Sequence, residues 1–168
     1  MFHAFDNDGP SRPAARQDWM ALLARAPQPL LEQSLAEHLP TSQQWLRRPE
    51  TGLMMVQGRA GGTGERFNLG EITVTRCALR LGDAGSDAPV GVAYILGRSH
   101  RQVQLAALAD ALLQDAQWYE RLEASLLEPI RQHLREQEAR RRQRAQSTRV
   151  DFLTMAREAA GDEAEDQE

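Results

Sequence analysis

The stretch LMMVQGRAGGTGERFNLGEITVTRCALRL, residues 53–81, decides the fold. Residues 53–59 and 71–81 are rich in aliphatic and β-branched side chains, which predicts two β-strands. The glycine-rich residues 60–64 between them predict a loop, and such a short connection favours antiparallel pairing. In the second strand, apolar residues lie on one face early and on the other face late. Either both faces are partly covered, or a bulge lies near Arg76.

Two further strands are predicted on either side of this pair. Residues 43–48 form a short strand candidate, and Pro49-Glu50-Thr51-Gly52 is typical of a turn. Residues 90–96 alternate regularly and follow a turn at residues 82–89. The result is a predicted small antiparallel sheet of about four strands.

Helical periodicity flanks the predicted sheet on both sides. The predicted helices cover residues 14–25, 30–38, 99–115, a stretch from Trp118, and a new helix that begins near Pro129. The last of these becomes wholly polar at residues 135–146, so it must be solvated, ion-paired or bound to something else. The predicted fold class is therefore α+β, with the small sheet flanked by N-terminal and C-terminal helices.

The ends of the chain differ from this body. Residues 1–13 are predicted to be a flexible leader, and residues 14–157 a single domain whose last part, about 147–157, docks on a partner. Residues 158–168 carry six acids and no base, which predicts a disordered acidic tail. Without that tail the chain carries 20 arginines against 18 acids. A mildly basic body suits a phosphorylated ligand or an acidic partner, and lacks the basic stripe of a nucleic-acid binder.

Composition excludes several kinds of chemistry. There is no lysine, which excludes a Schiff base and the lysine-dependent phosphate loop. Cys77 is the only cysteine, so there is no intrachain disulfide, and the scattered histidines predict no metal site. No segment is apolar enough to span a membrane, and the N-terminus lacks a signal peptide, so a cytoplasmic location is expected. No catalytic set emerges, and Asp110 on an apolar helix is interpreted as a buried structural residue.

The strongest candidate site is the loop region between the two central strands. Its glycines permit close backbone approach, its N–H groups can form an anion-binding concavity, and its arginines can grip phosphate in a bidentate manner. The alternative is an ordinary hairpin loop with Glu65 in a surface ion pair. The candidate phosphate-binding residues here are Arg59, Gly61, Gly62, Thr63, Gly64, Glu65 and Arg66.

Two more places could hold an anion. Gly97-Arg98 lies between a strand and a helix, where N–H groups and the positive end of the helix dipole meet. Arg76 and Arg80 share one face of a strand. The alternatives are a capped turn with a solvated arginine, and a half-exposed face paired with acids.

An apolar segment follows the polar helix near the C-terminus. It either docks on a partner chain or packs back on this chain's own core. The candidate docking residues are Arg149, Val150, Asp151, Phe152 and Met155.

These same segments resemble the PhnG family, which contributes one of the chains of the bacterial phosphonate carbon–phosphorus lyase core complex. The resemblance covers residues 14–157 and rests on Arg16-Gln17-Asp18-Trp19-Met20, Glu50-Thr51-Gly52-Leu53, residues 59–67, Gly70, Thr73-Val74-Thr75-Arg76, Tyr94, Gly97-Arg98, Asp110-Ala111-Leu112 and residues 149–155. The leader, the turn at residues 82–89 and the acidic tail depart from the family's pattern.

The resemblance implies a role that composition cannot indicate. It implies work with subunits H, I and J in a two-fold symmetric hetero-oligomer, and formation of α-D-ribose 1-methylphosphonate 5-triphosphate from ATP and methylphosphonate, with release of adenine. It implies no cofactor on this chain alone, ATP as a substrate of the complex, and an iron–sulfur cluster and S-adenosylmethionine on a partner subunit. One cysteine cannot ligate such a cluster alone. A purely scaffolding subunit and a stand-alone phosphate- or nucleotide-binding domain are the alternatives.

Overall fold

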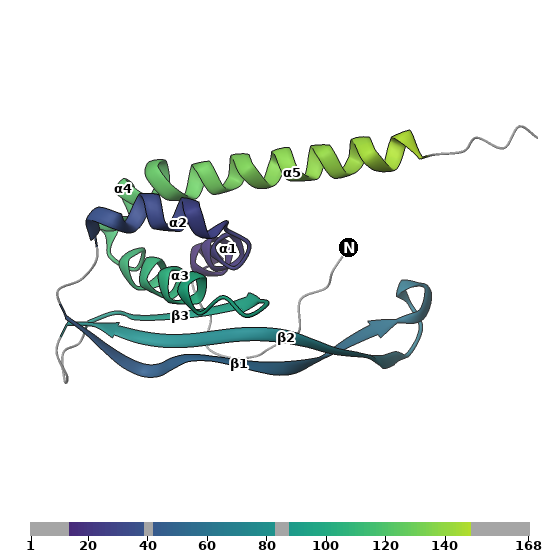
Figure 1. Ribbon diagram of the computed structural model, residues 1–168, viewed down its shortest axis with the longest axis horizontal. Coiled ribbons are helices and arrows are strands. Elements are labelled where there is room, and N and C mark those ends of the chain that lie inside the picture. The colour runs from purple at the N-terminus through teal and green to yellow at the C-terminus, as the bar shows by residue number, and fades with distance from the viewer. Residues whose placement is uncertain (1–13, 39–41, 83–87, 149–168) are drawn as a thin grey trace, which may run out of the picture.

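The computed structural model describes residues 14–38, 42–82 and 88–148 and confirms the α+β class (Figure 1). Its elements in chain order are α1 (Ala14–Leu23), α2 (Gln28–Leu35), the 3₁₀ turn η1 (Ala36–His38), β1 (Gln43–Arg59), the 3₁₀ turn η2 (Ala60–Gly62), β2 (Arg66–Leu81), β3 (Val90–Leu96), α3 (His100–Leu112), α4 (Ala116–Leu122), the π-helical turn η3 (Glu123–Leu127) and α5 (Glu128–Ser147). The predicted leader and acidic tail lie outside the described residues, and so does the predicted docking segment beyond Thr148.

The described sheet has three antiparallel strands in the order β1-β2-β3, rather than about four. The predicted turn at residues 49–52 is wrong, because β1 runs without a break from Gln43 to Arg59. Its register against β2 shifts between Trp45 and Arg47 and again between Arg47 and Glu50. Bulges therefore absorb the turn-like residues, and Pro49 is tolerated because β1 is an edge strand. A bulge near Arg76 was one of the two alternatives for β2. The second register shift lies on the neighbouring strand, next to Glu50, which is the cross-strand partner of Arg76.

The hairpin of β1 and β2 is longer than predicted. β2 begins at Arg66, five residues before the predicted start at Glu71, and β3 has the predicted bounds. We call residues 53–71 the hairpin arm, since this part extends beyond α1, α2 and α3 in Figure 1. Its large apolar side chains are exposed, and the clearest are Leu53, Met54, Met55, Phe67 and Leu69.

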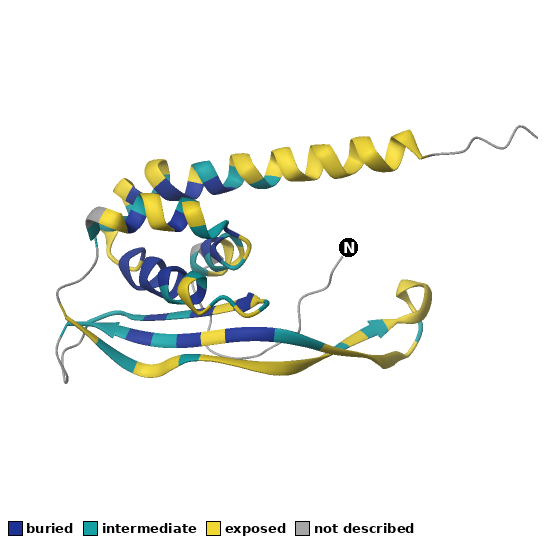
Figure 2. Cartoon of the chain, viewed as in Figure 1, coloured by how far each residue is buried: buried dark blue, intermediate teal, exposed yellow. Residues whose placement is uncertain are grey.

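The core lies around α3, which is packed between the sheet and the other helices (Figures 1 and 2). Residues Leu105 to Leu112 of α3 are all buried, because β2 and β3 contact one side of the helix and α1 and α2 contact the other. A helix that is apolar all round requires such a central position. Small side chains permit the close approach: a Cβ built on Gly91 would lie 1.9 Å from the carbonyl oxygen of Ala107.

The chain leaves the core through α4, η3 and α5. Asp115 caps α4 by accepting hydrogen bonds from the N–H groups of Gln117 and Trp118. Pro129 lies in the first turn of α5, as predicted, but the helical backbone continues without a break from α4 through η3 into α5. The π-helical turn therefore lies just before a residue that has no N–H to donate. Beyond Leu134 the helix is exposed and projects past the core, in the same direction as the hairpin arm. Among the described residues, no helix is long and apolar enough to cross a membrane.

Candidate functional site

The glycine-rich loop is the tip of the hairpin arm. Gly61 and Gly62 have positive φ values of 59° and 81°, which explains glycine at both positions. The N–H groups of Thr63 and Gly64 both donate to the carbonyl oxygen of Ala60. Two of the N–H groups expected to face an anion are therefore engaged within the loop. The alternative of a hairpin loop describes this backbone correctly, because no helix follows it.

Two arginines face each other where the loop joins the strands. Arg59 and Arg66 are cross-strand partners, and like charges at directly opposed positions destabilise a sheet. The Nη1 atom of Arg59 lies 3.5 Å from the carbonyl oxygen of Gly64, at the limit of a hydrogen bond. Both arginines are exposed, and guanidinium groups can hold an anionic group. Any anion binding at the tip would therefore use side chains rather than a cradle of N–H groups.

Arg76 lies elsewhere and is engaged by a carboxylate. Its Nε atom donates to Oε1 of Glu50 at 2.8 Å, and Nη1 of Arg47 donates to the same oxygen at 2.6 Å. The hydrogen bonds from Arg47 and then from Arg76 lower the pKa of the Glu50 carboxyl below its ordinary value. The predicted alternative of an ion-paired strand face therefore describes Arg76. A shallow hollow of about 330 Å³ lies beside it, lined also by Met54, Val74 and Tyr94.

Arg98 lies at the junction of β3 and α3, and its side chain is exposed. Gly97 has φ of 98°, and its N–H donates to the carbonyl oxygen of Thr73. The Ser99 hydroxyl caps α3 by accepting from the N–H of Gln102. Within the described residues Arg98 has no ion pair. The structure here therefore matches the alternative, a capped turn with a solvated arginine.

A chain of hydroxyl groups fixes the histidine beside this junction. The Thr75 hydroxyl donates to the carbonyl oxygen of Gly97 at 2.6 Å, so it must accept from the hydroxyl of Thr51, 3.0 Å away. Thr51 then accepts from Nε2 of His100, also at 3.0 Å. The neutral ring of His100 therefore carries its proton on Nε2, and Nδ1 is its acceptor. The sequence patterns of β1 and β2 could not predict this chain of hydrogen bonds, because the chain depends on which residues of the two strands lie opposite each other.

The structure does not bring the candidate residues into one site. Arg66 and Arg76 are ten positions apart in one strand, which at ~3.3 Å per residue separates them by roughly 30 Å. The tip of the hairpin arm is thus remote from Arg76 and Arg98, which lie over the core. The roles predicted for all of these residues stay predictions, and the candidate docking residues from Arg149 to Met155 lie outside the described part of the chain.

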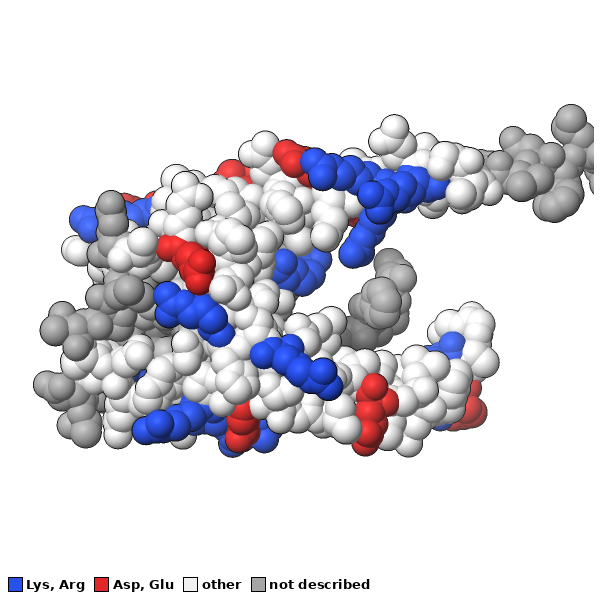
Figure 3. Space-filling view, in the orientation of Figure 1, with Lys and Arg blue, Asp and Glu red and all other residues white. Residues whose placement is uncertain are grey.

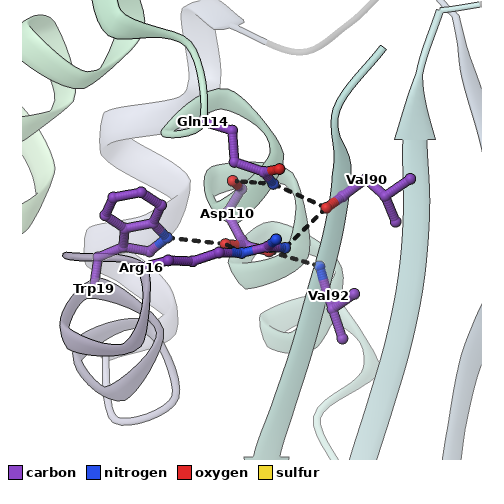
Figure 4. A network of polar contacts seen from close by, with 6 residues as sticks. All are labelled: Arg16, Trp19, Val90, Val92, Asp110 and Gln114. Carbon is purple, nitrogen blue, oxygen red and sulfur yellow. Dashed lines mark hydrogen bonds and ion pairs between the residues drawn. The ribbon is translucent and has the colours of Figure 1, made fainter. Parts of the chain in front are cut away.

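The best-formed polar cluster is centred on Asp110 (Figure 4). This residue is completely buried, as its place on an apolar helix predicted. Its Oδ2 atom accepts from Nη2 of Arg16 at 2.8 Å and from the N–H of Val92 at 2.9 Å, and its Oδ1 atom accepts from Nε1 of Trp19 at 2.9 Å. Arg16 and Gln114 both donate to the carbonyl oxygen of Val90. This network locks α1, α3 and β3 together and is structural.

The partners of Asp110 were not predicted from the sequence. Arg16 and Trp19 are three positions apart on α1, so they share one face of that helix. From that spacing one could have predicted that both side chains donate to the same acceptor. It could not name the acceptor, because Asp110 is more than ninety positions away along the chain.

Comparisons with known proteins agree with the sequence motifs. The family described as "Phosphonate metabolism protein PhnG" matches residues 14–158. A curated relative from Rhizobium meliloti (strain 1021), named "Alpha-D-ribose 1-methylphosphonate 5-triphosphate synthase subunit PhnG", is 42% identical over 152 residues. The matched region covers 86% of this chain and 90% of the relative. The chain therefore belongs to the PhnG family of phosphonate metabolism proteins.

Proposed function

We propose that this chain is a subunit of α-D-ribose 1-methylphosphonate 5-triphosphate synthase, and that it acts together with the other subunits of a carbon–phosphorus lyase complex. The observation that carries this proposal is the match to a relative of that name over nearly its whole length. The substrates are ATP and methylphosphonate. A phosphonate oxygen forms the new bond to C1 of the ribose, the bond from C1 to adenine breaks, and adenine leaves.

The shape of the chain supports a role within an assembly. The hairpin arm exposes large apolar side chains, and an isolated two-stranded hairpin is marginally stable in water. Such a surface is typical of a protein that is covered by a partner. A stand-alone nucleotide-binding domain would not need it. The proposed partners are subunits H, I and J in a two-fold symmetric cytoplasmic complex, with the iron–sulfur cluster and S-adenosylmethionine on a partner subunit.

Whether the chain also contacts substrate depends on the tip of the hairpin arm. If Arg66 helps to bind a phosphate or phosphonate group, then Arg66→Ala should leave assembly intact and lower adenine release about tenfold or more, since charge-assisted hydrogen bonds contribute ~1.5–3 kcal/mol. Adenine release is measured on the reconstituted complex by chromatography. Arg48→Ala, an exposed arginine on β1 outside the arm, is the matched control and should have no effect.

The outcomes separate the alternatives. Intact assembly with lost turnover supports a contribution to the site, and lost assembly supports a scaffolding subunit. Unchanged turnover would refute a role for Arg66 in binding substrate. A well-behaved monomer that binds ATP and never associates with the other subunits would contradict the proposed function itself.

A further inference from the structure

The hairpin arm and the outer half of α5 enclose a wide notch. We define the outer half as residues 135–147, which project beyond the core beside the arm (Figures 1 and 3). The space-filling view shows basic side chains of α5 gathered above this notch. The two walls are chemically different, and each lacks a cover among the described residues.

The helical wall is positively charged. Residues 135–147 contain five arginines and two glutamates, and all of them are exposed. Arg135 pairs with Glu128, and Arg142 pairs with Glu138. The side chains of Arg140, Arg141 and Arg144 have no ion pair within the described part of the chain. Their spacing of three and four residues places Arg144 beside each of the other two on the helix surface.

The opposite wall is mainly apolar, although the exposed Glu71, the cross-strand partner of Met55, lies on the same face. Leu53 and Met55 are 67% and 48% exposed, and they alternate with Met54 along β1. They lie on the same face as Thr51, whose hydroxyl contacts His100 of α3, so this is the face of the sheet that the helices cover. Leu53 is the cross-strand partner of Thr73, which accepts a hydrogen bond from Gly97, so Arg98 lies at the base of this wall.

We propose that the notch receives an amphipathic segment of another subunit, with acidic residues on one side and apolar residues on the other. This inference rests on the proposed function, because it requires a partner subunit. The apolar side of the segment would cover Leu53 and Met55, and its carboxylates would face Arg140, Arg144 and Arg98. The charge complementarity favours an acidic partner, and an exposed polar helix of this length needs such contacts, since isolated helices are marginal in water.

The test measures the dissociation constant between this chain and the assembled remaining subunits at low and high salt. Arg140→Glu with Arg144→Glu should weaken binding tenfold or more at low salt and should flatten its salt dependence. Leu53→Ser with Met55→Ser should also weaken binding, with the salt dependence unchanged. Arg48→Glu with Arg121→Glu makes the same change in net charge on exposed residues of β1 and α4 that belong to neither wall, and should stay within about twofold of the wild type.

Two additions keep the result clear. Arg140→Gln with Arg144→Gln removes the charges while keeping good helix formers, and it should reproduce the loss if charge is the cause. Circular dichroism checks that α5 remains helical. Deletion of residues 158–168 tests whether the chain's own acidic tail fills the notch, and a gain in affinity on deletion would overturn the proposal.

Three results would refute this inference. One is that the glutamate and glutamine variants bind like the wild type with the same salt dependence. Another is that the control pair weakens binding as much as the α5 pair, which would show an effect of net charge alone. The third is that the isolated chain binds ATP and the α5 variants abolish this binding. By contrast, a wild-type chain that does not bind the other subunits at all would refute the proposed function, not the notch alone.

Discussion

Asp110 shows how far single residues could be read from the sequence. Its burial was predictable, because an aspartate within Ala-Asp-Ala-Leu-Leu has apolar neighbours on every side. Its partners were not, because they come from α1 and from the backbone of β3. A local pattern shows that a buried carboxylate needs donors, and only the packing of distant elements decides which donors it has.

The hydrogen bonds of Asp110 should contribute strongly to the free energy of unfolding. Asp110→Ala leaves the indole of Trp19, the N–H of Val92 and the guanidinium of Arg16 without their acceptor. Breaking a buried ion pair from one side costs about 3–5 kcal/mol. Urea unfolding followed by tryptophan fluorescence should show this loss. Asp18→Ala, at an exposed position on α1, should change the free energy of unfolding by less than ~0.5 kcal/mol, and an equal effect of both variants would contradict the account.

Cys77 should make stability depend on alkaline pH. Burial raises the pKa of its thiol to about 12, and the thiol contacts the carbonyl oxygen of Val103. The folded pKa is above the unfolded pKa of ~8.5–9, so the thiol's contribution is complete below pH ~9 and falls as the pH rises toward 12. The advantage of the wild type over Cys77→Ala should shrink by about 2 kcal/mol between pH 8 and pH 10.5. Denaturant titrations at both pH values measure it, and a constant difference would show that the thiol ionises equally in both states.

At the scale of elements, strand and helix types were predictable and strand ends were not. The alternation of residues 90–96 predicted the bounds of β3, because alternation persists to both ends of the strand. The residues Pro49-Glu50-Thr51-Gly52 resemble a turn locally, yet β1 continues through them because bulges keep its pairing with β2. Pairing across the sheet overrode local turn chemistry. The same pairing extends β2 back to Arg66, through Asn68 and Gly70, which are poor strand formers by themselves.

The contact between β3 and α3 should be sensitive to a single methyl group. Gly91→Ala would place its Cβ against Ala107 and Ala111, so helix and strand must separate. Overpacking of this kind costs about 1–3 kcal/mol or more, and thermal unfolding should show a lower Tm. Gly52→Ala is the matched control, since a Cβ there meets no atom within 4 Å, and it should be nearly neutral. A stable Gly91→Ala protein would contradict the close packing of these elements.

At the scale of the whole molecule, the chain exposes large apolar side chains that an isolated protein would bury. The hairpin arm carries apolar side chains beyond the core, and α5 carries arginines beyond it in the same direction. The polar character of residues 135–146 was predicted from the sequence, together with the need for solvent, ion pairs or a partner. The apolar arm was not predicted, because its residues have the composition of an ordinary strand and only the arrangement of the helices leaves them uncovered.

The most direct test of the proposed function is to reconstitute the synthase from its purified subunits with and without this chain. The reaction is followed by adenine release and by the ³¹P signal of the ribose phosphonate product. Product should form only when this chain is present, and the chain should co-purify with the other subunits in a fixed ratio. Full product formation in its absence would show that the synthase does not need this chain.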